Sequence, residues 1–359
     1  MKKISTGSLL LFLVFIITAV STVEQRPYRL LNSDLLTIRE TNEEYITNLV
    51  GNVHFFYGET EFYCDRAEIY EKQKITRMQG NVHVLEDTLK LWADQVEYFR
   101  LQEVLQLDGN IKIEESHQDS TKRYFEAEHV EYFRNERQLN AFENVIFLDE
   151  RENLNGLCGE LRYSLETGYG FLLKEPVIWM TDKDSMAVQA EKMEYYKDFK
   201  KIIANFNVMV SSSEFELKSD FLLYFAEEER AIFLGNPKFN SDFADAVSEE
   251  LEIHFNERKI EKANLQDSCL VFFRVEGSDE KKSWVKAERM EFDFIKGKID
   301  FGRATSNVHS YFEQDKTVKR DYSVNESTGS ELHLYIKDEK IEAIKMFDQV
   351  GGMYKFHKK

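Results

Sequence analysis

Acidic residues recur along this chain about every 30 residues, and each directly follows a small residue. The pattern has ten such positions, and all but the fifth and the tenth are acidic. Two carboxylates that flank one bond can perform glycoside hydrolysis, and clustered carboxylates can hold calcium. Acids spread one per repeat form a row instead. We therefore expect a structural role, in which they accept hydrogen bonds from the backbone where a strand bends, with calcium binding along the row as the alternative. The acids are Asp34, Asp65, Asp94, Glu128, Glu191, Asp220, Glu249 and Glu288.

Two histidines, His54 and His83, end the repeated sequence Gly-Asn-Val-His, and His309 occupies a similar position later in the chain. Histidine is a common zinc ligand, but a zinc site needs three or four ligands, and stacking would bring only two imidazoles together. We therefore expect outward-facing histidines and no metal site.

Three cysteines, Cys64, Cys158 and Cys269, are an odd number for an exported chain, in which disulfides would form if the geometry allowed. Cys64 and Cys158 lie three repeats apart, too far for a disulfide, whose Cα atoms must lie within about 7 Å of each other. We expect buried thiols that act as small apolar residues.

The acids belong to a longer pattern, in which a small residue and an acid are followed by apolar residues at the fourth and sixth positions. Apolar residues two apart, with polar residues between them, predict a half-buried β-strand. Ten copies of this pattern begin at Ser33, Cys64, Ala93, Ala127, Cys158, Ala190, Ser219, Ser248, Ala287 and Gly329.

A second strand is predicted between successive copies, around the tripeptide Gly-Asn-Val at residues 51–53, 80–82 and 109–111. Later repeats carry variants of it, such as Glu175-Pro176-Val177. A two-strand unit cannot bury its apolar face alone, so the repeats must stack, each giving one strand to each of two facing sheets. The predicted fold is all-β: an elongated, open-ended β-jellyroll built of about ten two-strand repeats of roughly 30 residues.

The charge of the chain excludes several classes of partner. With 65 acidic and 47 basic residues, the formal net charge of −18 repels nucleic acids and anionic membrane surfaces. No phosphate-binding sequence of the form Gly-x-x-x-x-Gly-Lys-Ser/Thr occurs, so we expect no nucleotide-driven motor. We also expect no nucleic-acid binding and no cofactor.

The first residues differ in composition from the rest. Lys2 and Lys3 precede an apolar run at residues 9–17, and the small residues Ala19 and Ser21 follow. This order is typical of a secretory signal peptide, and about a dozen apolar residues are too few for a membrane-spanning helix. We assign residues 1–21 to a cleaved signal peptide, with a retained inner-membrane anchor as the alternative.

Residues 22–359 are assigned to the repeats, without a linker rich in proline, glycine or serine. The pattern is weakest at residues 235–247, where Pro237 cannot donate a hydrogen bond to a neighbouring strand. A boundary between two stacks at this point is an alternative to one continuous stack.

The strand around Gly-Asn-Val, followed by a small residue, an acid and a tyrosine as in residues 80–98, resembles the LptA/OstA family of lipopolysaccharide-transport proteins. The resemblance extends from about Arg29 to Phe356. It implies a periplasmic β-jellyroll whose hydrophobic interior shields the acyl chains of lipopolysaccharide, or of a similar glycolipid, between the inner and outer membranes. It also implies partners of the same fold joined by edge-strand pairing, including head-to-tail self-association, and no enzymatic activity.

Three roles stay open within this interpretation. The first is a soluble bridge-type transport protein of the periplasm, and the second is a membrane-anchored LptC-like member associated with the inner membrane. The third, from a different class, is a secreted β-solenoid with a structural role or an action on polysaccharide.

For a lipid route, the working surface is the inward face of the strands. The alternative is that these side chains pack on one another as a dry sandwich core. The inward residues expected to bind lipid are Val53, Phe55, Phe62, Val82, Val84, Leu91, Tyr98, Ile111, Ile113, Tyr132, Val145, Phe147, Tyr163, Val177, Trp179, Tyr195, Val208 and Val210.

Overall fold

The computed structural model describes ten stretches of the chain, and the expected signal peptide at residues 1–21 lies outside them. The described stretches hold 26 β-strands in antiparallel pairings, which confirms the predicted all-β class. Among them, no helix is long and apolar enough to cross a membrane. The described residues are 28–41, 44–86, 88–116, 119–150, 153–164, 166–180, 186–257, 259–274, 282–313 and 322–357.

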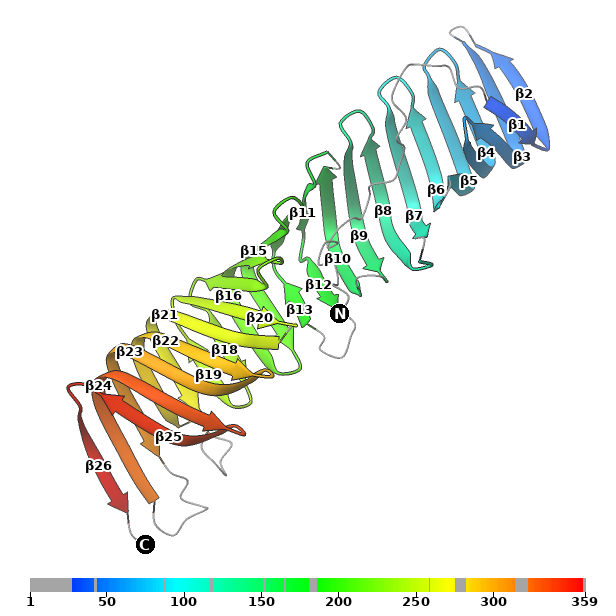
Figure 1. Ribbon diagram of the computed structural model, residues 1–359. Helices are drawn as coiled ribbons and strands as arrows, with labels where there is room; N and C mark the ends of the chain where they lie inside the picture. Colours follow the sequence, from blue (N-terminus) through cyan, green and yellow to red (C-terminus); the bar gives the residue numbers. More distant parts are fainter. Residues whose placement is uncertain are drawn as a thin grey trace. The chain divides into compact units, whose positions relative to one another are not determined.

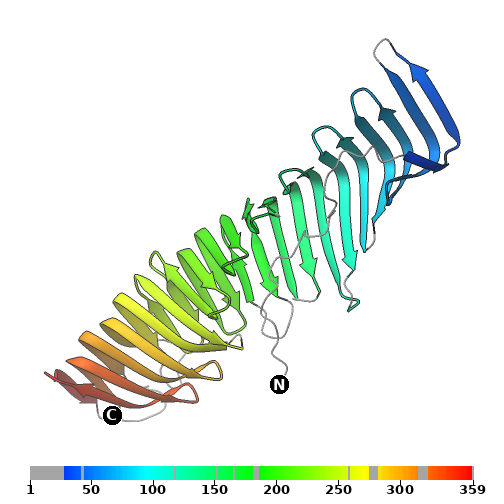
Figure 2. The same ribbon diagram turned by 45° about the horizontal axis from the view of Figure 1, so that its top comes forward.

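The chain divides into two compact units. Unit 1 comprises Met1–Asp182 and Lys192–Asp198, and unit 2 comprises Lys183–Glu191 and Phe199–Lys359. The boundary considered at residues 235–247 lies within unit 2, where strands on both sides of it pair in sequence order. Figures 1 and 2 show the successive strands of each unit side by side in chain order.

The strands of unit 1 are β1 (Tyr28–Asn32), β2 (Leu35–Glu40), β3 (Tyr45–Tyr57), β4 (Thr60–Tyr70), β5 (Ile75–Glu86), β6 (Leu89–Phe99), β7 (Val104–Ser116), β8 (Lys122–Phe133), β9 (Gln138–Asp149), β10 (Leu154–Ser164), β11 (Tyr169–Leu173), β12 (Val177–Met180) and β14 (Lys192–Tyr196). The strands of unit 2 are β13 (Met186–Gln189), β15 (Lys201–Ser212), β16 (Phe215–Phe225), β17 (Arg230–Leu234), β18 (Lys238–Ser241), β19 (Ala244–Val247), β20 (Glu250–Asn256), β21 (Lys259–Phe273), β22 (Ser283–Ile295), β23 (Lys298–Glu313), β24 (Tyr322–Lys337), β25 (Lys340–Phe347) and β26 (Gly351–His357). Short turns join most neighbours, so each unit is an antiparallel meander.

The long strands bend near their middle, and β5 illustrates how. Its residues 75–79 pair with residues 95–99 of β6, and its residues 82–86 pair with residues 89–93. Gly80 and Asn81 stand together opposite Asp94, so two residues on one strand oppose one on the other. Such a bulge bends the strand sharply. The segment containing residues 75–79 belongs to what we call arm A, and the segment containing residues 82–86 belongs to arm B.

The bend changes how the two layers are built. We expected each repeat to give one strand to each of two facing sheets. Instead, every bent strand contributes one half to arm A and the other half to arm B, and the next strand returns antiparallel to it. The reason is that the Gly-Asn-Val position lies in the middle of a strand rather than between strands, so the chain crosses both layers before it turns.

Twelve pairs of successive described residues are left-handed, and two of them, Lys296-Gly297 and Asp338-Glu339, are turns between strands. The other ten, from Gly51-Asn52 to Asp348-Gln349, are the bends of every second strand. The small-acid positions form the bends of the strands between them, as at Asp65 and Asp94. Six of the twenty bends interrupt the strand, so the 26 strands make twenty bent segments. The predicted count of ten two-strand repeats is therefore confirmed.

The core of each unit lies between its two arms. Arm A contributes Leu139 and Leu172 in unit 1, and arm B contributes Phe55, Ile111 and Phe147, each less than 2% exposed. In unit 2 the corresponding fully buried side chains are Leu217, Ile253, Phe273, Met290, Leu332 and Leu334. Each strand alternates an inward apolar residue with an outward polar one.

Candidate functional site: the apolar interior and an outer groove

The bends hold the two arms together along one edge of each unit. At Gly51, Gly80 and Gly109, φ is between 74° and 77°, a region that residues with a side chain rarely occupy. A Cβ atom on Gly80 would also overlap the carboxylate of Asp65, and the same relation joins Gly109 to Asp94. Glycine is therefore required at these bends both for its backbone angle and for the space that the neighbouring acid occupies.

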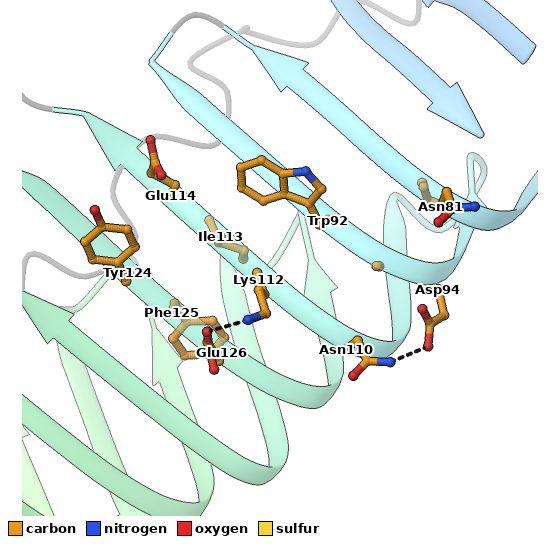
Figure 3. Close-up of a pocket in the computed structure, with 12 residues that line it drawn as sticks. Asn81, Trp92, Asp94, Asn110, Lys112, Ile113, Glu114, Tyr124, Phe125 and Glu126 are labelled. Carbon is orange, nitrogen blue, oxygen red and sulfur yellow. Dashed lines mark hydrogen bonds and ion pairs between the residues drawn. The ribbon is translucent and has the colours of Figure 1, made fainter. Parts of the chain in front are cut away.

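The recurring acids bond to the amide of the next bend. The Nδ2 atom of Asn81 donates to Asp65 at 2.9 Å, and that of Asn110 donates to Asp94 at 2.8 Å (Figure 3). In unit 2, Asn207 donates to Glu191 at 2.5 Å. The acids thus have the expected structural place at a bend, although their partners here are asparagine side chains rather than backbone amides. Among the described residues, no group of three or more His, Cys, Asp or Glu side chains could hold a metal ion.

Most of the predicted lipid-binding residues do lie between the arms. Phe62, Val84 and Tyr98 are half-buried and share a face with buried neighbours in register. Thirteen of the others are less than 10% exposed: Val53, Phe55, Val82, Leu91, Ile111, Ile113, Tyr132, Val145, Phe147, Tyr163, Tyr195, Val208 and Val210.

Val177 and Trp179 lie on the outer face, contrary to the expectation. They pair with Leu157 and Asn155, and Leu157 is 41% exposed, whereas Ile178 pairs with the inward Gly156. The bend falls at Lys174-Glu175, one residue earlier than the sequence pattern indicates. Proline is fixed at negative φ and cannot take the left-handed position, so Pro176 moves the bend. A shift of one residue turns every side chain of a strand to the other face.

Many inward residues were not singled out from the sequence as lipid-binding. They include most of arm A and the interior of unit 2, and the fourth and sixth positions of the repeated pattern would have identified many of them. Buried examples are Ala67, Ile69, Met78, Val96, Leu107, Phe125, Ala141, Leu161, Met193, Leu222, Leu265, Val285 and Ala304.

The two arms pack closely against each other. Across the interior of unit 2, the rings of Phe273 in arm B and Phe292 in arm A lie 6.3 Å apart. A cavity of about 30 Å³ lies near them, lined by Ala244, Val271 and other apolar residues. That volume is on the order of one water molecule. This cavity of unit 2 is too small for an acyl chain, so a chain inserted there would have to move the arms apart.

The arms also touch on the side opposite the bends, which we call the open edge. In unit 1 the hydroxyl of Tyr28 in β1 bonds the Oγ1 of Thr76 in arm A at 2.5 Å. The rings of Tyr57 in arm B and Tyr98 in arm A lie 6.3 Å apart. Burial raises the pKa of Tyr28, and the Arg100 guanidinium lies 5.6 Å from its ring centre. At this part of the open edge, a hydrogen bond and ring contacts join the two arms, whereas on the other side the bends join them.

His54 and His83 face outward and stand in a row of rings on arm B. His54 stacks on Tyr63 with 4.1 Å between ring centres, and His83 stacks on Trp92 at 4.9 Å. His54 also pairs with Glu61 at 2.7 Å. Desolvation lowers the pKa of His83, which favours its neutral form. The sequence indicated the outward direction of these histidines but not their ring partners.

The three cysteines are buried and free. Cys64 and Cys158 lie at small-acid bends, and Cys269 lies at a bend of the other type in unit 2. Burial raises the pKa of each thiol to about 12, which keeps it protonated and unreactive near neutral pH.

An outer groove of about 570 Å³ lies beside the row of rings in unit 1 (Figure 3). Its lining includes the aromatic side chains of Trp92 and Tyr124 and the charged side chains of Lys112, Glu114 and Glu126. The Nζ of Lys112 pairs with Glu126 at 3.1 Å. The remaining lining residues are Asn81, Val82, Ala93, Asp94, Asn110, Ile113 and Phe125. The sequence analysis missed this groove, because its residues come from four successive strands, β5 to β8, and have no common motif.

Two of three comparisons with known proteins find similar proteins. Residues 27–135 match the family described as OstA-like protein. The search of curated proteins finds no match. A solved structure, the periplasmic LptA homologue LptH of the lipopolysaccharide transport device of Pseudomonas aeruginosa, aligns with 17% identity and a TM-score of 0.29. The alignment covers 32% of this chain and 82% of LptH. The match to the OstA-like family thus covers the first repeats of the chain, at residues 27–135, which is less than half of its length.

Proposed function

We propose that this chain is a periplasmic, bridge-type lipopolysaccharide-transport protein, which shields lipid acyl chains between its two arms as they pass between the inner and outer membranes. The observation that carries the proposal is the apolar inward face of the strands, which every bent strand of each unit continues. The first repeats with this face match the OstA-like family. We expect a binding and transfer role without catalysis.

The apolar interior addresses the main energetic barrier to moving a lipid through water. Each methylene group that leaves an apolar environment costs about 0.8 kcal/mol, so exposing a whole acyl chain is prohibitive. Inward residues such as Phe55, Val82 and Ile113 offer similar apolar surface at successive strands. A chain moving past them exchanges one apolar contact for another, and the free energy changes little from step to step.

Loading a chain would require the arms to separate, because the interior is closely packed. The bends are the natural hinges, since every second strand has a pair of left-handed residues at its bend. Opening unit 1 would break contacts across its open edge, such as those of Tyr57 with Tyr98 and of Tyr28 with Thr76. Apolar contacts between the arms would be replaced by contacts with the acyl chain, which offsets much of the cost of opening.

A uniform apolar route has no preferred direction. The sequence lacks a phosphate-binding loop, so the driving force would come from a partner. Partners of the same fold could pair with the terminal strands. Within the described residues, β2 pairs only with β3, and β25 and β26 pair only with β24. Unpaired strand edges are ready sites for strand addition.

Apolar side chains are exposed on both of these terminal strands. Leu36 and Ile38 of β2 are 49% and 61% exposed, although they occupy positions that are buried in later repeats. Tyr354 and Phe356 of β26 are 63% and 58% exposed. Such surfaces fit the ends of an interior that continues into a neighbouring jellyroll, either a transport partner or a second copy of this chain.

Site-specific photo-crosslinking tests the proposal with a matched pair of adjacent positions. Phe147 is 1% exposed and faces inward, whereas Ile146 is 44% exposed on the outer face of the same strand. We expect lipopolysaccharide adducts with a crosslinker at position 147, and also at positions 55 and 113, but not at position 146. Equal adducts at positions 146 and 147, or none at the inward positions, would refute the proposal.

Two further measurements separate the remaining alternatives. N-terminal sequencing of protein from the membrane fraction tests the anchored, LptC-like role, for which residues 1–21 must be retained. For a secreted structural or polysaccharide-acting role, the protein would be recovered from the medium and its deletion would leave lipopolysaccharide delivery intact.

A further inference from the structure

We propose that the outer groove beside Trp92 binds a neutral saccharide. The argument begins with the row of rings that leads to the groove. His54, Tyr63, His83 and Trp92 occupy the same register position on β3, β4, β5 and β6. Their neighbouring rings stack, with centres 4.1, 5.8 and 4.9 Å apart. The row thereby fixes the orientation of Trp92, whose ring is within 10° of parallel to that of His83.

The row of rings ends at Trp92. The next residue in register is Lys112 of β7, whose side chain points to Glu126 of β8 (Figure 3). One face of the indole lies against His83, and the side towards β7 borders the groove. Tyr124, on β8, lines the groove two strands away, which places it roughly 10 Å from the Trp92 strand. Lys112 and Glu114 of β7 lie between these two strands in register, so a sugar ring over β7 would have an aromatic side chain on either side and these polar groups beneath it.

The polar groups of the groove suit the hydroxyl groups of a sugar. Carboxylates accept hydrogen bonds, ammonium groups donate them, and side-chain amides do both, as sugar hydroxyls do. Glu126 and Lys112 are paired yet remain 44% and 61% exposed, and Asn110 stands at the bend. The C–H groups on one face of a sugar pack on an aromatic ring. A groove that combines rings with polar groups therefore suits a saccharide ligand better than it suits a lipid or an ion.

The charge of the groove selects among saccharides. Three carboxylates line it, of which Glu126 pairs with Lys112 and Glu114 pairs with Lys122 at 2.9 Å. The carboxylate of Asp94 is left as the excess negative charge. Phosphorylated or carboxylated sugars would therefore be repelled, and the formal net charge of −18 adds to this repulsion. The expected ligand is a neutral sugar chain.

Unit 2 repeats the arrangement on its own arm B. Trp284 of β22 stacks on Tyr311 of β23, with ring centres 6.1 Å apart and planes within 13°. A groove of about 350 Å³ begins at Tyr311 and is lined by Glu313, Glu326 and Lys355, with His357, Val324 and Met353. A ring at the end of a stack, two carboxylates and a lysine thus recur on strands with a different sequence.

Two sources can supply a neutral sugar chain: the saccharide part of a carried glycolipid, or a free polysaccharide. The inference rests on the proposed function only for the first source. The test of the saccharide site uses sugars without acyl chains, so that its result does not depend on lipid binding in the interior.

The experiment is isothermal titration of the full chain with two probes. One is the oligosaccharide of lipopolysaccharide from which acyl chains and phosphates have been removed, and the other is a panel of neutral hexasaccharides. Binding of the first identifies the glycolipid as the source, and binding of the second alone identifies a free polysaccharide. Absence of binding to both probes at millimolar concentration would overturn the proposal.

Variants locate the binding. Trp92→Ala and Tyr124→Ala should each weaken the affinity by about tenfold, the loss of one ring contact. Trp92→Phe keeps a ring in the stack and should weaken it less, which separates loss of contact from loss of folding. The control is Phe199→Ala, an aromatic residue that is 70% exposed in a turn of unit 2. Unchanged affinity in both alanine variants would place the bound sugar elsewhere and overturn the assignment.

The two proposals can fail separately. Crosslinks from position 147 to lipid, without binding of deacylated sugars, would remove the saccharide site and leave the lipid route. Sugar binding that is sensitive to Trp92, without lipid adducts at inward positions, would do the reverse.

Discussion

The first repeats of unit 1 and the later repeats of unit 2 build the same bend from different residues. In unit 1, Gly80-Asn81 bends opposite Asp94, whereas in unit 2, Ser306-Asn307 bends opposite Ser330. Both pairs have positive φ, with 74° at Gly80 and 66° at Ser306. The comparison teaches that the pairing of the arms on either side imposes the bend. Glycine occurs at the bends where an aspartate would overlap a Cβ atom, as Asp65 would at Gly80.

The largest expected effect compares the interiors of the two units. Phe147→Ala and Phe273→Ala each remove a fully buried ring and should lower the free energy of unfolding by about 3–5 kcal/mol. Phe147 lies over Gly156, which has no side chain to fill the space, whereas Phe273 neighbours the rings of Phe243 and Phe292. Urea unfolding followed by circular dichroism should therefore show the larger loss for Phe147→Ala. Equal or reversed losses would contradict this difference.

The bends themselves provide the second test. Gly80→Ala should destabilise by about 2 kcal/mol or more, because alanine is strained at this φ and its Cβ overlaps the Asp65 carboxylate. The double variant Gly80→Ala with Asp65→Ala should regain the part of the lost stability that comes from the overlap with the carboxylate. The matched change in unit 2, Ser306→Gly, should alter stability by less than about 1 kcal/mol. The midpoints of urea unfolding measure all three, and a large loss in Ser306→Gly would show that the two bends differ in kind.

The hydrogen bonds between acids and asparagines should contribute more to stability in unit 1 than in unit 2. Asn81 donates to Asp65 at 2.9 Å, whereas Asn307 donates to Glu288 at 3.5 Å. Asp65→Ala should cost about 1 kcal/mol, and Glu288→Ala should cost less, because a longer hydrogen bond is weaker. Thermal unfolding of the two variants measures this difference. If Glu288→Ala proves the more damaging, its carboxylate must have a role beyond the bend.

The smallest expected effect is a change in the pH dependence of stability. The row of rings contains histidines in unit 1, whereas the corresponding row in unit 2 begins with a tryptophan. Desolvation, mainly, and Lys90 lower the pKa of His83. The unfolded chain therefore binds a proton at a higher pH than the folded chain, and stability falls as the pH drops through the unfolded pKa of about 6.5. Unfolding of wild type and His83→Gln at pH 7.5 and 5.5 measures the contribution. Identical pH dependence in both would exclude His83 as its source.

Much of this architecture was predictable from the sequence, because burial on one face of a strand imposes a period of two and stacking imposes a period of about 30 residues. Both periods are visible in the residues. Asp65 and Asp94 were rightly placed at bends, and Val82 and Phe147 on the inward face. Val177 and Trp179 were placed on the wrong face, because the position of a bend depends on which residues can take a positive φ.

The sequence by itself determined the all-β class, the number of repeats and most of the inward face, since these depend on local periodicity. Only the tertiary structure decided that each strand crosses both arms, that the interior is closely packed, and that Trp92, Lys112 and Tyr124 meet at an outer groove. These features depend on register between strands. Register is fixed by hydrogen bonds between residues far apart in the chain, and no local pattern records them.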